Sequence, residues 1–120
     1  MLKERVRAYC DTEENCSRIF LLAAAEEYGF SLSENILSAC SGIRGGFGIG
    51  SICSALVAAV MVLGLLCGDR VQEKRLLLLW KVQERFGCLD CGRLSALGDD
   101  CGLVLEEIAD ILQEVIEDEK

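Results

Sequence analysis

The chain has 120 residues, of which 52% are hydrophobic, and its 20 acidic and 12 basic residues give a formal net charge of −8. This length and apolar content predict a single domain over residues 1–120 that buries a core without needing disulfides. Because the basic residues are spread along an acidic chain, we expect no binding to nucleic acid. The lack of proline and the many Ala, Leu and Glu residues favour an all-α fold.

Three helices are expected in the first third of the chain. In the first of them, Leu2, Val6 and Tyr9 share one face. The second is predicted over Cys16–Tyr28, where a glycine follows, and a short third helix from Ser33 to about Cys40. The N-terminus is charged and lacks an apolar run of the signal-peptide type, so we expect a reducing, cytoplasmic setting.

A glycine-rich loop comes next, and it includes Gly45, Gly46, Gly48 and Gly50. Backbone NH groups of such a loop can cradle an anion, but no strand precedes this one and no Gly-Lys-Ser/Thr ends it. It is therefore not a typical nucleotide-binding loop. Two interpretations stay open: the glycines let the loop pack closely against neighbouring helices, or the loop points its NH groups at whatever Cys53 binds.

The segment Ile52–Leu66 is almost wholly apolar. It is shorter than the roughly 20 residues that a bilayer requires, so we expect no membrane span. We interpret it as the buried central helix of a compact bundle of about five helices. A further helix is predicted over Asp69–Phe86, in which Leu76, Leu77 and Trp80 form a candidate homodimer surface.

The C-terminal third is expected to contain a turn, a short helix and one long helix. The long helix begins at Gly98-Asp99-Asp100 and carries core positions from Leu103 to Ile116, with acidic residues on its outer face. No strand pattern and no internal repeat is present in the sequence.

Four of the eight cysteines closely follow residues of the helix-capping type. These pairs are Asn15 with Cys16, Ser51 with Cys53, Asp90 with Cys91, and Asp100 with Cys101. A helix start carries partial positive charge and unpaired NH groups, which favour a thiolate or an anionic metal–sulfur cluster over a neutral thiol. The pattern therefore predicts a metal or redox site at the starts of several helices.

The ligand chemistry of this site is limited by the absence of His. A site with four protein ligands would be all sulfur, which suits an iron–sulfur cluster or structural zinc. The long spacings between the cysteines differ from the paired Cys-x-x-Cys knuckles of a zinc ribbon. The missing His also removes the usual general base, so no catalytic residue is predicted and enzymatic activity is left open.

A metal-free thiol–disulfide protein is the main alternative. Its candidate redox-active or resolving thiols are Cys88 and Cys10, although Asp90 disfavours a thiolate in the Cys-x-x-Cys motif that Cys88 begins. A structural module that binds zinc, or a helical interaction module with incidental cysteines, is the third possibility. Cys40 and Cys67 are expected to pack as small apolar residues.

The chain also resembles a known family, the C-GCAxxG-C-C family of putative redox-active proteins. The residues that carry the resemblance extend from Asn15 to Ile116: they are Asn15-Cys16, the run Cys53-Ser54-Ala55-Leu56-Val57-Ala58 after the glycine loop, Arg85-Phe86-Gly87, Asp90-Cys91 and Cys101. Ser54, Ala55 and Ala58 stand where the family mostly has Gly, Ala and a later Gly. Because all three are small, close helix packing is retained.

The resemblance has implications for cofactors. It implies that the four recurrent cysteines of the family are Cys16, Cys53, Cys91 and Cys101. The family is similar to a domain of the split-Soret cytochromes, in which an iron–sulfur site accompanies haem. Haem is not expected here, because the chain has neither His nor Cys-x-x-Cys-His. The resemblance thus implies an iron–sulfur site. Together with the ligand chemistry it leads us to expect a cluster of the 2Fe-2S kind, for electron transfer or redox sensing with an unidentified redox partner, with zinc or no metal as the alternatives.

Overall fold

In the computed structural model, the described residues are 2–10, 15–43, 46–90 and 101–117, without the side chains of 101–103. Within these ranges the chain is helical, apart from connecting turns and one isolated β-bridge. The α-helices are α1 (Leu2–Cys10), α2 (Cys16–Tyr28), α3 (Glu34–Ala39), α4 (Ser54–Cys67), α5 (Val71–Phe86) and α7 (Cys101–Glu117). The shorter helical turns are η1 (Cys40–Gly42), η2 (Gly46–Gly50) and η3 (Gly68–Arg70). The predicted all-α fold is confirmed.

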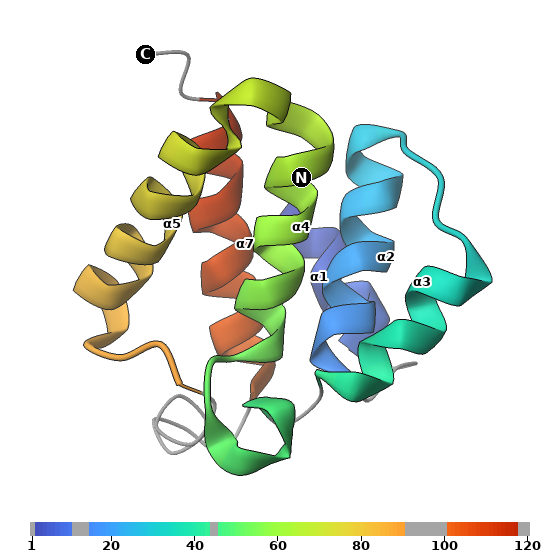
Figure 1. Ribbon diagram of the computed structural model, residues 1–120, viewed down its shortest axis with the longest axis horizontal. Coiled ribbons are helices and arrows are strands. Elements are labelled where there is room, and N and C mark those ends of the chain that lie inside the picture. The colour runs from blue at the N-terminus through green and yellow to red at the C-terminus, as the bar shows by residue number, and fades with distance from the viewer. Residues whose placement is uncertain (1, 11–14, 44–45, 91–100, 118–120) are drawn as a thin grey trace.

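Successive helices run in alternate directions (Figure 1). α1, α3 and α5 run towards one end of the bundle, and α2, α4 and α7 start from that end. Side-chain contacts agree with this order, because Lys3 lies 3.4 Å from Asp110 and Arg7 lies 2.6 Å from Glu106, which makes α1 antiparallel to α7. One end of the bundle therefore gathers three helix starts and three helix ends.

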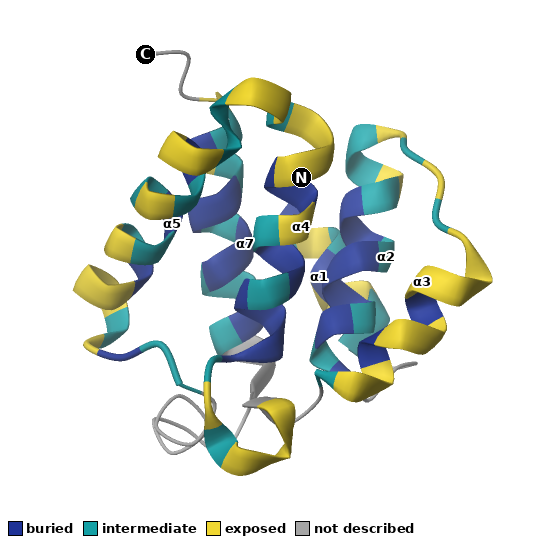
Figure 2. Cartoon of the chain, viewed as in Figure 1, coloured by how far each residue is buried: buried dark blue, intermediate teal, exposed yellow. Residues whose placement is uncertain are grey.

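The core lies between α4 and its neighbours α2, α5 and α7 (Figure 2). α2 packs against α4, and both helices carry small side chains that are fully buried, namely Ala23, Ala24, Ala55, Ala58 and Ala59. This packing confirms the expected central position of α4. Its last turns are less covered, since Met61, Leu65 and Leu66 are exposed.

The helical stretch Ser54–Phe86, which joins α4 to α5 through η3, is long and apolar enough to cross a membrane by length and composition. In its most apolar window 39% of the residues are buried inside the bundle. The core helix of a soluble protein can give the same result as a membrane helix by these measures. The absence of a membrane span therefore stays a prediction.

Local signals explain where most helices end. Gly29 and Gly87 adopt left-handed backbone after α2 and α5, and their NH groups donate to the carbonyl oxygens of Ala25 and Gln83 at 2.9 and 2.7 Å. Glycine adopts this conformation without the strain that a Cβ atom causes. Ser33 caps the start of α3, as its side chain accepts a bond from a backbone NH. The glycine signals and the Ser33 boundary are thus confirmed.

Two predicted helix starts lie two residues too early. α4 begins at Ser54 and not at Ile52, because the backbone of Cys53 is still extended. α5 begins at Val71 and not at Asp69, because residues 68–70 form the tighter turn η3. In both cases the connecting segment before the helix has a backbone that differs from that of an α-helix.

Candidate functional site

The end of the bundle where α2, α4 and α7 start is rich in cysteine, and we call it the cysteine end (Figure 1). Six of the eight cysteines lie in helix ends or connecting segments at this end: Cys10, Cys16, Cys40, Cys53, Cys88 and Cys101. Cys67 closes α4 at the opposite end. Cys91 lies outside the described residues, as does the side chain of Cys101.

Only two of the four sulfur atoms in the predicted site belong to described side chains. Among the side chains that are described, no group of three or more His, Cys, Asp or Glu residues could hold a metal ion, and no disulfide joins two cysteines. Two of the four family positions, Cys16 and Cys53, are among these side chains. Convergence of all four sulfur atoms therefore stays a prediction.

Cys16 is the first residue of α2, and the residue before it fixes that helix start. The Asn15 side-chain oxygen accepts bonds from the backbone NH of Ser17 at 3.0 Å and from its hydroxyl at 2.6 Å, which confirms the predicted cap. The Asn15 amide also donates to the carbonyl oxygen of Cys40 at 3.3 Å. Asn15 is buried, and its three bonds tie the start of α2, where the half-buried Cys16 lies, to the end of α3.

Cys53 is positioned differently from the prediction. The expected cap, Ser51, is exposed, and Cys53 itself is the N-cap residue of α4, without a side-chain capping bond. Its carbonyl oxygen accepts bonds from Leu56 and Val57 at 3.0 and 3.2 Å. The assignment of Ser51 as the cap is wrong because the chain stays extended through Cys53, which leaves Ser51 too far from the first turn.

The NH of Cys53 donates to the carbonyl oxygen of Leu89 at 3.0 Å, and Ile52 forms an isolated antiparallel bridge with Asp90. No pattern in the sequence indicated this pairing. It fastens the start of α4 to the segment that follows α5, and the next residue in the chain after Asp90 is Cys91. The capping role predicted for Asp90 concerns residues outside the described ranges, and so does the role predicted for Asp100.

The additional thiols differ in their surroundings. Cys88 is buried, and its thiol donates to the carbonyl oxygen of Phe86 at 3.6 Å. Cys40 is buried and donates to the carbonyl oxygen of Ile36 at 3.5 Å, which agrees with its expected packing role. Cys10, a half-buried residue, ends α1 at the cysteine end.

The glycine loop lies at the cysteine end, where residues 46–50 form a wide turn (Figure 1). The interpretation that its glycines permit close packing is wrong for Gly42 and Gly48, because a Cβ atom there would meet nothing within 4 Å. Gly48 and Gly50 instead serve backbone conformation, with φ angles of 80° and 68°. Gly45 lies outside the described residues, and the direction of the NH groups stays untested.

Sequence reasoning missed Phe47 in this loop. Its φ angle is 65°, the left-handed region that bulky residues rarely adopt, and its side chain is 50% exposed. Ile49, two residues later, is 82% exposed. Apolar residues alternating with glycine are the one sequence signal that could have drawn attention to these positions.

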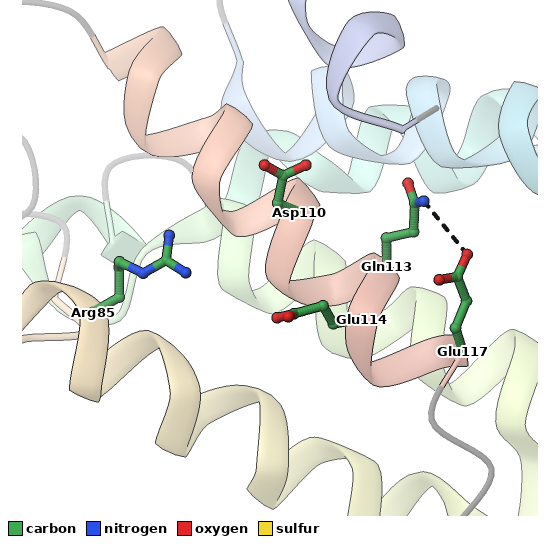
Figure 3. Close-up of a pocket in the computed structure, with 5 residues that line it drawn as sticks. All are labelled: Arg85, Asp110, Gln113, Glu114 and Glu117. Carbon is green, nitrogen blue, oxygen red and sulfur yellow. Dashed lines mark hydrogen bonds between the residues drawn. The ribbon is translucent and has the colours of Figure 1, made fainter.

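Two surface hollows between α5 and α7 have no cysteine among their lining residues. A groove of about 330 Å³ between α5 and α7 is lined by Arg85, Asp110, Gln113, Glu114 and Glu117 (Figure 3). Gln113 donates to Glu117 at 3.4 Å, and Arg85 forms an ion pair with Glu107. No cysteine lines this groove, so it is distinct from the candidate site.

The expected homodimer surface is open to solvent. Leu76 is 65% exposed and Trp80 is 59% exposed, while Leu77 is half-buried against the core. A second hollow, next to Trp80, is lined by residues of α5 and α7. These exposures are compatible with a contact surface, and the dimer itself stays a prediction.

Comparison with known proteins gives one match. A protein family described as "Putative redox-active protein (C_GCAxxG_C_C)" matches residues 14–115, a range that includes all four predicted ligand positions. No curated protein and no solved structure matches the chain. Because the match covers most of the sequence, the chain belongs to the C_GCAxxG_C_C family of putative redox-active proteins.

Proposed function

We propose that Cys16, Cys53, Cys91 and Cys101 hold an iron–sulfur cluster, of the 2Fe-2S kind, which the protein uses for one-electron transfer or redox sensing. The observation that carries the proposal is the shared direction of three helices. Cys16 is the first residue of α2, Cys53 is the N-cap of α4, and Cys101 is the first residue of α7, and all three helices start at the same end of the bundle.

Electrostatics at this end favour such a cofactor. Each helix start contributes partial positive charge, and the first NH groups of a helix lack acceptors within it. Thiolates and an anionic cluster are stabilised by both effects, although the chain as a whole carries a net charge of −8. Cys16, Cys53 and Cys101 thus occupy the helix positions that best tolerate negative charge.

The residues present fit the chemistry of the group. With no His in the chain, sulfur is the expected donor, and four thiolates are a common ligand set for iron–sulfur clusters. Cys53 is only 8% exposed, which suits a cofactor whose potential depends on solvent access. When bound, the cluster would supply one-electron chemistry, and the protein would position and shield it.

Supporting contacts hold these positions in place. The Asn15 bonds connect the start of α2 to Cys40, and the bond from Cys53 to Leu89 connects the start of α4 to the segment before Cys91. Contacts of this kind orient ligands and tune metal sites in other proteins. We propose that they limit the movement of the ligands during a change of redox state.

Anaerobic purification followed by iron, sulfide and zinc analysis and a visible absorption spectrum tests the proposal. We expect a coloured protein that contains iron and sulfide. Single Cys→Ser changes at the four family positions should each abolish cluster retention. Cys67→Ser is the matched control, because Cys67 lies at the opposite end of α4 and should leave the cluster intact.

Other outcomes separate the alternatives. A colourless protein free of iron would contradict the proposal, and bound zinc in its place would indicate a structural site. If no metal is present, thiol titration before and after reduction tests the thiol–disulfide alternative. In it Cys88 would exchange with Cys91, or other pairs of the family cysteines would do so, with Cys10 as a candidate resolving thiol. Equal loss of iron from Cys67→Ser and from the family variants would show that the ligand assignment is wrong.

A further inference from the structure

The turn at residues 46–50 connects the α3 region to the start of α4 at the cysteine end (Figure 1). Among the described contacts, its first half is held by the bond from the NH of Phe47 to the carbonyl oxygen of Ile43, at 3.3 Å. No charged residue occurs from Gly46 to Ser54, although 27% of the chain is charged. This turn is therefore an apolar segment directly before the ligand position Cys53.

Its two large side chains are placed unfavourably for a segment whose only role is to connect helices. Ile49 is 82% exposed and Phe47 is 50% exposed, so neither side chain is buried in the described core. Phe47 also adopts left-handed backbone at φ 65°, where glycine would be free of strain. Strain and apolar exposure in one short turn indicate that these side chains serve a purpose other than folding.

The neighbouring backbone permits a change of direction. Gly48 lies between the two side chains, and a Cβ atom at this position would meet nothing within 4 Å, so the space next to Gly48 is open. Gly50, with φ 68°, separates Ile49 from the extended residues before α4. Small rotations at these two glycines would redirect both side chains without disturbing the bridge between Ile52 and Asp90.

We infer that Phe47 and Ile49 form the apolar cover of the proposed cluster site and lie over it when the metal is bound. The inference rests on the proposed function and adds to it the residues that exclude water. An apolar shell around a metal–thiolate site controls solvent access and so affects both potential and loss of metal. The cover would come from the same short segment that leads into Cys53.

Two substitutions test the inference in the full-length protein. Phe47→Gly relieves the backbone strain and is expected to leave the melting temperature of the metal-free protein unchanged or higher. Ile49→Ser replaces an exposed side chain and should also fold normally. After anaerobic reconstitution with iron and sulfide, both variants are expected to lose iron to a chelator about tenfold faster than the wild type.

Met61→Ser is the matched control, because Met61 is an exposed apolar residue of α4 outside the turn. Its rate of iron loss should equal that of the wild type. Equal rates in Phe47→Gly, Ile49→Ser and the wild type would overturn the cover and leave the cluster proposal standing. A wild-type protein that retains neither iron nor sulfide would overturn both.

A fluorescence measurement reports the position of the turn directly. The chain has one tryptophan, so Phe47→Trp in a Trp80→Phe background places the only probe in the turn. The quantity to compare is the rate constant of collisional quenching by acrylamide, which is the quenching slope divided by the fluorescence lifetime of the same sample. It should fall severalfold when iron and sulfide are loaded. Trp80 of the wild type is the control and should show no such change. A probe in the turn that stays equally accessible in the loaded protein would overturn the cover.

Discussion

The side-chain amide of Asn15 donates to the carbonyl oxygen of Cys40 at 3.3 Å, while the oxygen of the same side chain caps α2. One buried residue thus joins the start of α2 to the end of α3. Cys16 follows directly in the chain, so the position of this ligand candidate depends on both bonds. Removal of both bonds, compared with removal of the bond to Cys40 alone, should show how much each one contributes.

Asn15→Ala removes both bonds, so we expect the free energy of unfolding to fall by about 1–2 kcal/mol for the cap of α2 and by about 0.5–1.5 kcal/mol more for the bond to Cys40. Asn15→Ser keeps an oxygen that can accept from the NH of Ser17 but has no amide to reach Cys40. Its expected loss is about 0.5–1.5 kcal/mol, the usual net value of one hydrogen bond. Urea unfolding measures both values. Equal losses in the two variants would show that the cap contributes nothing beyond the bond to Cys40.

The parts of the fold that were predictable depend on signals local in sequence. Asn15 and Ser33 mark helix starts, and Gly29 and Gly87 mark helix ends, because capping bonds and left-handed backbone involve residues within one turn. The apolar run that became α4 was also recognised as the central helix, since no polar face interrupts it.

The parts that were missed depend on residues far apart in the chain. Ile52 pairs with Asp90 through the backbone, and a single bridge produces no alternation of side chains that a sequence pattern could reveal. The misplaced cap at Ser51 has the same origin, because the bridge keeps the chain extended up to Cys53. The burial of Lys74 was missed as well, since a charged residue on a helix usually faces solvent.

The contact between Arg5 and Glu27, at 2.8 Å, predicts a pH dependence of stability. Its hydrogen bond from Arg5 lowers the pKa of Glu27 from the ordinary value of 4.5, and this contact joins α1 to α2. Because the pKa is lower in the folded state, the stabilisation is present above pH 4.5 and is lost as the pH falls through the folded pKa. Glu27→Gln should therefore weaken the acid dependence of the free energy of unfolding in this range.

Urea unfolding at several pH values from neutral to acidic would measure this effect. Glu84→Gln is the control, because Glu84 is an exposed residue of α5, distant in sequence from the contact. An unchanged slope of stability against pH in Glu27→Gln, or an equal change in Glu84→Gln, would contradict the assignment. The difference is expected to shrink in high salt, since both partners are partly exposed.

Lys74 is 4% exposed, and its Nζ atom donates to the carbonyl oxygen of Val115 at 2.8 Å. Val115 lies in the last turn of α7, where carbonyl groups lack NH donors within the helix and a cation is favourable. Lys74→Met keeps the aliphatic stem but leaves this carbonyl without the ammonium donor. We expect a loss of about 1–3 kcal/mol in the free energy of unfolding.

The neighbouring residue Arg75 provides the comparison, because it lies on the same helix and is less buried. Arg75→Met should change the free energy of unfolding by no more than about 0.5 kcal/mol, as is usual for surface substitutions. Similar losses in Lys74→Met and Arg75→Met would mean that the bond to α7 contributes no specific stabilisation. Thermal or urea unfolding of the two variants gives the answer.

The exposed surface of α5 leads to a prediction about assembly. Leu76 and Trp80 are one helical turn apart and both are more than half exposed, and the half-buried Leu77 adjoins them. Symmetric dimers form through the same surface patch on both subunits, and Trp often contributes much of the binding energy of such a contact. We therefore expect sedimentation equilibrium to detect a dimer whose dissociation constant rises at least about tenfold in Trp80→Ser, a loss of about 1.4 kcal/mol.

Because Trp80 is 59% exposed, this variant should retain the melting temperature of the isolated subunit. Ile36→Ser, which changes an exposed apolar residue of α3, should leave the dissociation constant unaltered. A wild-type protein that stays monomeric at high concentration, or equal weakening by both substitutions, would show that α5 is not the contact surface.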